Sequence, residues 1–382
     1  MSGHLESKSN SDTSPPASLF RRRGLWLAAT MVAVYVALVP LHTQDGANHR
    51  QVAVLLERLI SADVQDPVYQ SNLGLLRTNV LFSGGYALAA AKIGIPIHLY
   101  ERLFVSGFLI LLLVGYRRFL AEWTPGRTDL WVWILPITMH ALFVTGMYNF
   151  LAATALTLPL LTYLKRLAEH PSAKTLAAMS ALAWLAFLAH PFPFFVLPAA
   201  WLWLVTGRTE RPGAFMWSGG GVLVGLLFLG FALPMVASAV PQNPYVFKPP
   251  LELLAGLVYY NFPLFSSWAV VAAVPVLVCA IAMAWMSLQN ADLRNPYRRG
   301  MLLWLGMLLA YFLFPSEGHG GAHLNERFLP FVWIFLPLGL AGVGEGIAEG
   351  GGRIAKGGNE LAAGGGGVAE GVTGEGQFVH GK

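Results

Sequence analysis

The run 103-LFVSGFLILLLVGY-116 decides the fold class, because it is almost entirely apolar and contains no charged residue. His98, Glu101 and Arg102 lie in the stretch 96–102 that leads into it. Arg117 and Arg118 follow it directly. A helix needs about 20 mostly apolar residues to cross a hydrocarbon core about 30 Å thick, and this run with its flanks comes close to that length. The run therefore predicts a membrane-spanning helix that ends in a basic loop.

Composition extends this prediction to the whole chain of 382 residues. Hydrophobic residues make up 55% and charged residues 12%, whereas a soluble domain is typically about 25% charged. We therefore predict an all-α, polytopic transmembrane bundle of about ten to eleven spans. The net charge of +5 comes from basic residues in short loops, as the positive-inside rule expects, so no nucleic-acid partner is predicted. Cys279 is the only cysteine, which excludes an intrachain disulfide and a cysteine-based zinc site.

Three regions differ in composition. Residues 1–20 are polar and rich in Ser and Pro, which predicts a disordered cytoplasmic tail. Residues 21–340 form the predicted transmembrane domain. Residues 341–382 are dominated by glycine and are predicted to be a low-complexity tail without a packed core.

The connections between apolar runs alternate between two kinds from residue 116 onward. Basic loops lie at 117–127, 165–174, 208–211 and 294–299, and charge-poor loops with motif-like sequences lie at 146–150, 189–193, 241–262 and 315–327. The positive-inside rule places the basic loops in the cytoplasm and the others outside. Arg21, Arg22 and Arg23 precede the first apolar run, so both termini are expected in the cytoplasm of a cell whose inner or plasma membrane holds the protein.

The first outer loop, residues 42–98, is the longest polar connection. Apolar residues at helical spacing within 51–60 predict an amphipathic helix on the membrane surface. The run 79–95 either lies in the outer interface, which makes ten spans, or crosses the membrane, which makes eleven. The interfacial placement is preferred because it leaves every later basic loop inside. Beyond this loop, the run 129–146 predicts one continuous span.

Asp45 is the strongest candidate for a catalytic group. It follows the first span within the stretch 42-HTQDGANHR-50, where a carboxylate is suited to take a proton from a hydroxyl acceptor. Two structural readings compete with this one: Asp45 is also a candidate helix cap, and Asp45–Gly46 is a turn signal.

Other polar residues in the outer loops are candidates for substrate binding. Arg50, Lys248 and Arg327 are suited to pair with a lipid phosphate or pyrophosphate, although snorkelling to ordinary headgroups explains the same pattern. The remaining candidates are the polar residues His49, Asn149, His190 and His323.

His319, His323 and Glu326 are residue types that could bind a metal ion. The spacing suits zinc only on a helix, and Gly320 with Gly321 disfavours a helix there. No metal ligand is therefore assigned, and a divalent cation is left open as an alternative. The sequence contains no nucleotide-binding or serine-hydrolase motif.

A signal-anchor helix followed by an Asp-bearing outer loop with an amphipathic helix resembles the GT-C class of membrane glycosyltransferases, which includes protein mannosyltransferases and the aminoarabinose transferases of lipid A. The stretches that carry the resemblance are 44–49, 77–79, 94–102, 146–150, 190–191 and 325–328. The similarity covers roughly residues 24–340, and none of its motifs is diagnostic alone.

The resemblance implies an inverting transfer of a sugar from a polyprenyl-phosphate donor to an unidentified acceptor at the outer face of a bacterial inner membrane. By position, Asp45 is the expected base. Many members of the class carry a second acidic residue in a later outer loop, and here Glu317 or Glu326 takes that place. Glu326 is therefore the second predicted catalytic residue. The class also implies contact with membrane lipid.

Two rival functions remain at this level. One is a transporter or flippase for a lipid or small solute, although the chain shows no inverted repeat and its charges lie at loop edges. The other is a non-catalytic, GT-C-like membrane subunit that binds a partner.

Overall fold

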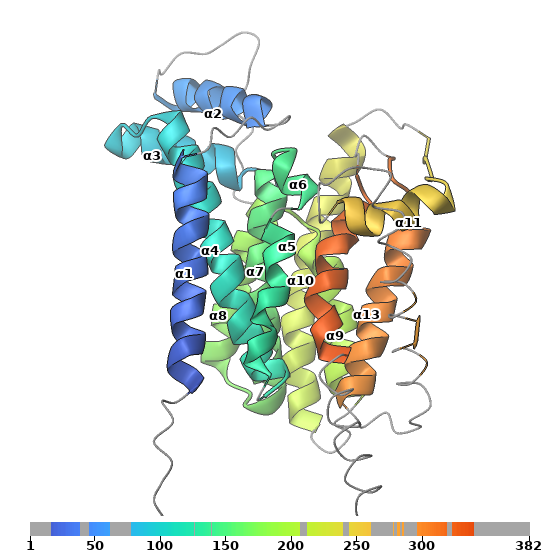
Figure 1. Ribbon diagram of the computed structural model, residues 1–382. Helices are drawn as coiled ribbons and strands as arrows, with labels where there is room; N and C mark the ends of the chain where they lie inside the picture. Colours follow the sequence, from blue (N-terminus) through green and yellow to red (C-terminus); the bar gives the residue numbers. More distant parts are fainter. Residues whose placement is uncertain are drawn as a thin grey trace, which may run out of the picture.

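The computed structural model describes residues 17–38, 46–61, 78–125, 127–138, 140–206, 212–239, 244–260, 278, 281–282, 285, 296–318 and 323–339. Long helices run side by side in a bundle (Figure 1): α1 (Ala17–Leu38), α4 (Ile97–Trp123), α7 (Tyr148–Glu169), α8 (Ala173–Ala189), α9 (Pro193–Val205), α10 (Pro212–Ala239), α13 (Pro296–Leu313) and a last helix at 329–339. The described part has no strand, only an isolated bridge between Val246 and Glu317. The all-α prediction is confirmed.

Two of the described helices are long and apolar enough to cross a bilayer. They are α4, with 27 residues, and the 18-residue segment Phe215–Ala232 of α10. The first contains the apolar run 103–116. Their length and composition are consistent with a membrane location.

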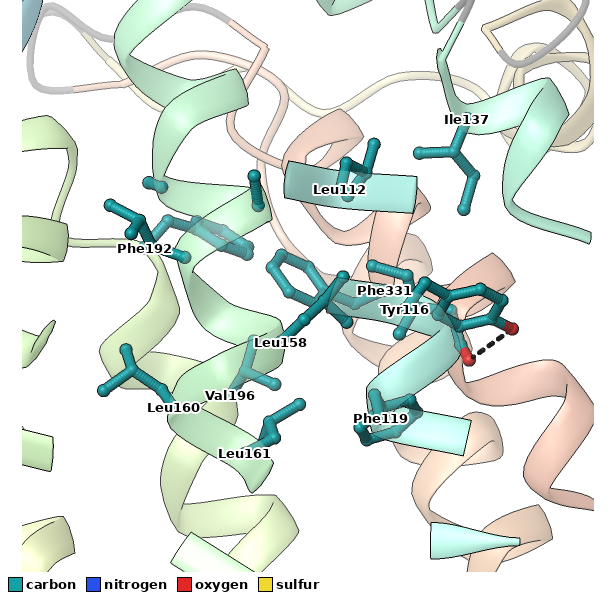
Figure 2. Close-up of a cluster of buried hydrophobic side chains, with 14 of the residues drawn as sticks. Leu112, Tyr116, Phe119, Ile137, Leu158, Leu160, Leu161, Phe192, Val196 and Phe331 are labelled. Carbon is teal, nitrogen blue, oxygen red and sulfur yellow. Dashed lines mark hydrogen bonds between the residues drawn. The ribbon is translucent and has the colours of Figure 1, made fainter. Parts of the chain in front are cut away.

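The pair formed by α4 and α7 is the centre of the packing (Figure 2). Gly115 lies where the two helices are in contact, since an added Cβ there would lie 3.4 Å from the Cβ of Leu158, an ordinary van der Waals distance. The neighbouring Tyr116 is fully buried, and its hydroxyl donates a hydrogen bond to the carbonyl oxygen of Ile334 at 3.2 Å. The last helix is thereby tied to α4 within the apolar interior.

The prediction of one continuous span over 129–146 is wrong. This segment divides into a 3-10 helix, η1 (Thr128–Ile134), and two single turns, α5 (Leu135–Thr138) and α6 (Ala141–Val144). His140 caps α6 by accepting a hydrogen bond from the backbone of Leu142, and the N–H of Ala141 donates to the carbonyl of Tyr260. Pro136, which lacks a backbone donor, adds a local reason for the break.

The two ends of the bundle differ in what they carry. Four short helices lie at one end (Figure 1): α2 (Gly46–Ser61), α3 (Leu81–Ile93), α6 and α11 (Pro250–Tyr259). We call this the polar end. The opposite end, where α4 and α7 finish and α13 begins, is called the basic end. The predicted amphipathic helix at 51–60 is part of α2, and the predicted interfacial run at 79–95 contains α3, which packs against α2.

The predicted span at 264–287 lies almost entirely outside the described residues, as do the N-terminal 16 residues and the Gly-rich stretch from residue 340 onward.

Candidate functional site at the polar end

A first polar cluster joins α2 to the bundle. Nη1 of Arg50, on α2, contacts both carboxylate oxygens of Glu101 at 2.9 Å. Glu101 lies in the first turns of α4 and is 3% exposed, and its Oε1 also accepts a hydrogen bond of 2.6 Å from the hydroxyl of Tyr148 at the start of α7. We call Arg50, Glu101 and Tyr148 the Arg50–Glu101 cluster. Nε and Nη2 of Arg50 make no hydrogen bond within the described part of the chain, so the guanidinium retains donors for a ligand.

Two predicted binding residues flank this cluster. The ring of His49 lies 5.7 Å from the ring of Tyr148 and 6.0 Å from that of Phe82, measured between centroids. Asn149 is buried, and its amide accepts a hydrogen bond from the N–H of Phe82 and donates one to the carbonyl of Asn79, both at 2.9 Å. Asn149 thus holds the chain that enters α3, where Asn79 adopts a left-handed φ of 61°.

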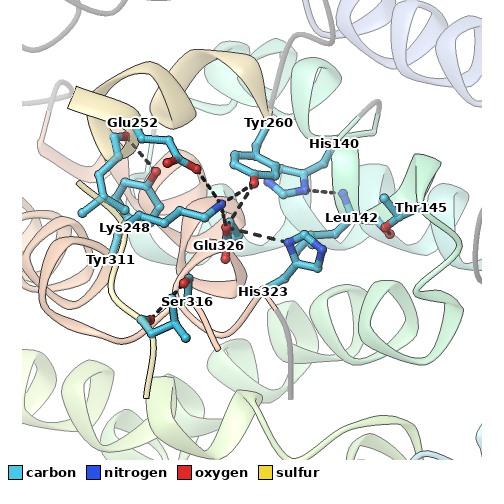
Figure 3. A network of polar contacts seen from close by, with 12 residues as sticks. His140, Leu142, Thr145, Lys248, Glu252, Tyr260, Tyr311, Ser316, His323 and Glu326 are labelled. Atoms are coloured by element: carbon cyan, nitrogen blue, oxygen red, sulfur yellow. Dashed lines mark hydrogen bonds and ion pairs between the residues drawn. The ribbon is translucent and has the colours of Figure 1, made fainter. Parts of the chain in front are cut away.

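A second polar cluster lies around Glu326 (Figure 3). The Glu326 side chain is fully buried, and its Oε1 accepts hydrogen bonds from Nζ of Lys248 at 2.6 Å and from the hydroxyl of Tyr260 at 3.0 Å. Nδ1 of His323 lies 3.7 Å from the same oxygen. Lys248 also donates to Tyr260 at 2.9 Å and pairs with Glu252 at 3.4 Å. We call Lys248, Tyr260, His323 and Glu326 the Lys248–Glu326 cluster.

Backbone pairing explains how Lys248 reaches Glu326. The N–H of Val246 donates to the carbonyl of Glu317, and the carbonyl of Val246 accepts from the N–H and hydroxyl of Ser316. This bridge holds the chain before α11 against the chain that leads to 3-10 helix η2 (Glu326–Phe328). Pro249 and Pro250 then start α11, because a proline in the first helical turn lacks a donor that the helix does not need.

The charges in this cluster stabilise one another. Burial alone would raise the pKa of Glu326, but its contacts with His323 and Lys248 outweigh burial and lower that pKa to about 2. Burial likewise opposes the charge on Lys248, yet its contacts with Glu326 and Tyr260 raise its pKa above the usual value. Both groups are therefore ionised at neutral pH. A carboxylate with so low a pKa is a weak base. Glu326 is therefore better suited to hold the charged Lys248 in position than to accept a proton.

Buried polar atoms without a partner lie next to this ion pair. The side chain of Asn325 is fully buried, and neither its Oδ1 nor its Nδ2 has a hydrogen-bond partner among the described residues. The same holds for Oε2 of Glu326. Such atoms are rare in folded proteins because each one loses its hydrogen bonds to water. Together they supply a donor and two acceptors for a polar ligand.

His190 and Arg327 meet with one donor in excess. Nδ1 of His190 lies 3.1 Å from the N–H of Phe192, and its Nε2 lies 3.1 Å from Nη1 of Arg327. Burial, and then the Arg327 guanidinium, lower the pKa of His190, so the ring is neutral at pH 7. A neutral imidazole has a single acceptor nitrogen, whereas both neighbours are donors. One N–H therefore faces another donor, and an acceptor oxygen that received hydrogen bonds from both His190 and Arg327 would remove the conflict.

The structure thus brings together some predicted residues and not others. Lys248, His323 and Glu326 form one cluster, Arg50 belongs to another, and Asp45 and His319 lie outside the described residues. No role was predicted for Glu101, Tyr260 or Asn325. The sequence does contain a sign of Glu101, because a carboxylate at the start of an apolar helix is unusual. Its pairing with Arg50 of α2 could not be predicted from the sequence, because the two residues are 51 positions apart.

The described residues contain no group of three or more His, Cys, Asp or Glu side chains placed to hold a metal ion. Comparison with protein-family models, curated proteins and solved structures gave no match to this chain.

Proposed function

We propose that this chain is a multi-pass membrane glycosyltransferase, which moves a sugar from a polyprenyl-phosphate carrier to an acceptor at the outer face of the inner or plasma membrane. The donor excess at His190 and Arg327 carries the proposal, because a phosphate oxygen is an acceptor that suits both side chains. The proposal puts the polar end outside and both termini in the cytoplasm, in agreement with the positive-inside rule.

The reaction assigns a task to each group. A hydroxyl oxygen of the acceptor attacks the anomeric carbon while the bond from that carbon to the phosphate oxygen breaks. Asp45, which immediately precedes α2, takes the proton of the hydroxyl. The electron pair of the broken bond leaves with polyprenyl phosphate, whose negative charge Arg327, His190 and the uncommitted donors of Arg50 stabilise. The sugar is transferred with inversion.

Glu326 has a supporting task in this scheme. It is already ionised and holds Lys248 in its charged form, so it maintains a cation near the phosphate. The unpartnered amide of Asn325 is suited to bind a sugar hydroxyl, which is both donor and acceptor. The two clusters would then contact different parts of one donor.

The test uses the full chain in proteoliposomes with labelled polyprenyl-phosphate mannose or aminoarabinose and a membrane extract as the source of acceptor. Asp45→Asn should reduce transfer at least about 100-fold, the usual contribution of a general base. Arg327→Lys keeps the charge but loses the fork of donors, and it should raise KM more than it lowers kcat. Arg118→Gln, an exposed change on α4 toward the basic end, is the matched control.

Each outcome decides something. Undiminished transfer by Asp45→Asn would remove Asp45 as the base, and a KM for Arg327→Lys equal to that of the control would remove the phosphate site. Movement of the labelled lipid across the bilayer without loss of its sugar would show a flippase. No consumption of either donor by the wild-type protein would overturn the proposal.

A further inference from the structure

A cluster of aromatic and basic side chains closes the basic end where α4, α9 and α13 meet. The rings of Trp123 and Trp203 stack at 4.4 Å between centroids, with an interplanar angle of 30°. The guanidinium of Arg299 lies 4.8 Å from the Trp203 ring, and its Nη1 donates to the Trp203 carbonyl at 2.8 Å. Arg298 precedes it at the start of α13. We call Trp123, Trp203 and Arg299, together with Arg298 as the residue adjacent to Arg299 in the chain, the Arg–Trp cluster.

This cluster holds buried donors that have no acceptor among the described residues. Trp123 is 3% exposed and Trp203 is 8% exposed, and the indole N–H of each lacks a hydrogen-bond partner. Nε and Nη1 of Arg298 are buried and lack a partner as well. Every orphaned atom here is an N–H donor, in contrast to the mixture around Asn325. A group that offers only acceptors, such as an anion, would satisfy them.

Neighbouring carboxylates do not supply that acceptor. Three carboxylates lie toward this end in the described part of the chain, and each has its own cation: Glu122 pairs with Arg166, Asp129 with Arg127, and Glu169 with Lys165. Arg298 has no hydrogen bond or ion pair to any described residue, and neither has Arg117, one of whose guanidinium nitrogens is also buried. Among the described residues, this end therefore has more positive charge than its carboxylates neutralise.

We propose that the Arg–Trp cluster binds a phosphate group, with Arg298 and the two indole N–H groups as donors. The membrane location of the chain favours the headgroup of an anionic phospholipid as its source. Tryptophans concentrate at the membrane–water interface, and basic pockets between helices on the cytoplasmic side bind anionic headgroups. This site lies at the opposite end of the bundle from the proposed transferase site and does not depend on it.

The experiment uses the full chain in nanodiscs of phosphatidylcholine, with phosphatidylglycerol added in steps. Native mass spectrometry after release from the disc counts retained phosphatidylglycerol, and thermal unfolding measures its effect on stability. Wild-type protein should retain phosphatidylglycerol and unfold at a higher temperature in its presence. Arg298→Gln should weaken retention about tenfold, the loss of a charge-assisted contact. Trp203→Phe keeps an aromatic ring at this position but removes the indole N–H donor, so it should weaken lipid retention less than Arg298→Gln does.

Matched controls separate this site from general attraction to charge. Arg118→Gln removes an exposed cation from the same end and should retain as much lipid as wild type. A separate titration with inorganic phosphate distinguishes the source, because stabilisation by phosphate alone, lost in Arg298→Gln, identifies a free anion instead of a lipid at the same site. Equal retention by Arg298→Gln and Arg118→Gln, or no effect of either anion on wild type, overturns the proposal. Transferase activity plays no part in these readouts.

Discussion

Glu326 at the polar end and Glu122 at the basic end are both paired carboxylates, but their surroundings differ. Glu326 is fully buried and is held by Lys248 and Tyr260. The Glu122 side chain is 27% exposed, and its partner Arg166 is 49% exposed. Water screens the second pair and not the first. The comparison shows that Glu326 belongs to a buried ionic network at the polar end, whereas the Glu122–Arg166 pair at the basic end is partly exposed to water.

The largest expected effect comes from removing the buried charge. Glu326→Gln should lower the free energy of unfolding by about 3 kcal/mol, because it leaves Lys248 partly buried without its main counter-ion. Glu122→Gln, the matched change at the basic end, should cost less than about 1 kcal/mol. Thermal and denaturant unfolding in detergent would measure both. Similar losses in the two variants would contradict the distinction between the ends.

At the basic end, α13 and the last helix pack closely against each other. An added Cβ at Gly300 would lie 2.8 Å from the backbone carbon and the Cβ of Leu338, whereas an added Cβ at Gly306, on the same helix, meets nothing within 4 Å. Gly300→Ala should destabilise by about 2 kcal/mol, because overpacking forces the last helix to shift. Gly306→Ala should be neutral or stabilise by up to about 1 kcal/mol.

The same unfolding measurement would check this pair of variants. If Gly300→Ala were as stable as Gly306→Ala, the close contact between Gly300 of α13 and Leu338 of the last helix would be contradicted.

Acid should weaken the polar end selectively. The pKa of Glu326 is lowered to about 2 in the folded protein, so its contribution to stability is complete above its unfolded pKa and is lost as the pH falls through the folded value. Stability attributable to Glu326 should fall by about 1 kcal/mol by pH 4 and further toward pH 2. The difference between wild type and Glu326→Gln should therefore shrink on acidification. A difference that stays constant from pH 7 to pH 3 would refute this.

Local sequence patterns were sufficient for most of the helices. The apolar run 103–116 lies within α4, and the amphipathic pattern at 51–60 lies within α2, because helix formation depends on residues three and four apart. The same reasoning failed at 129–146, where composition favoured a span. The backbone there is interrupted by Pro136 and by a contact from Ala141 to the Tyr260 carbonyl. A partner more than a hundred residues away leaves no local pattern.

The sequence by itself determined that the chain is helical and apolar, and it located most of the candidate polar residues outside the long apolar runs. Only the tertiary structure decided which of those residues meet: Arg50 with Glu101, 51 residues apart, and Lys248 with Glu326, 78 residues apart. Helix propensity and hydrophobic periodicity act over a few residues. These pairs form because the packed helices bring distant segments of the chain together at the polar end. The buried donors and acceptors without partners also became visible only there, since burial is a property of the packed chain.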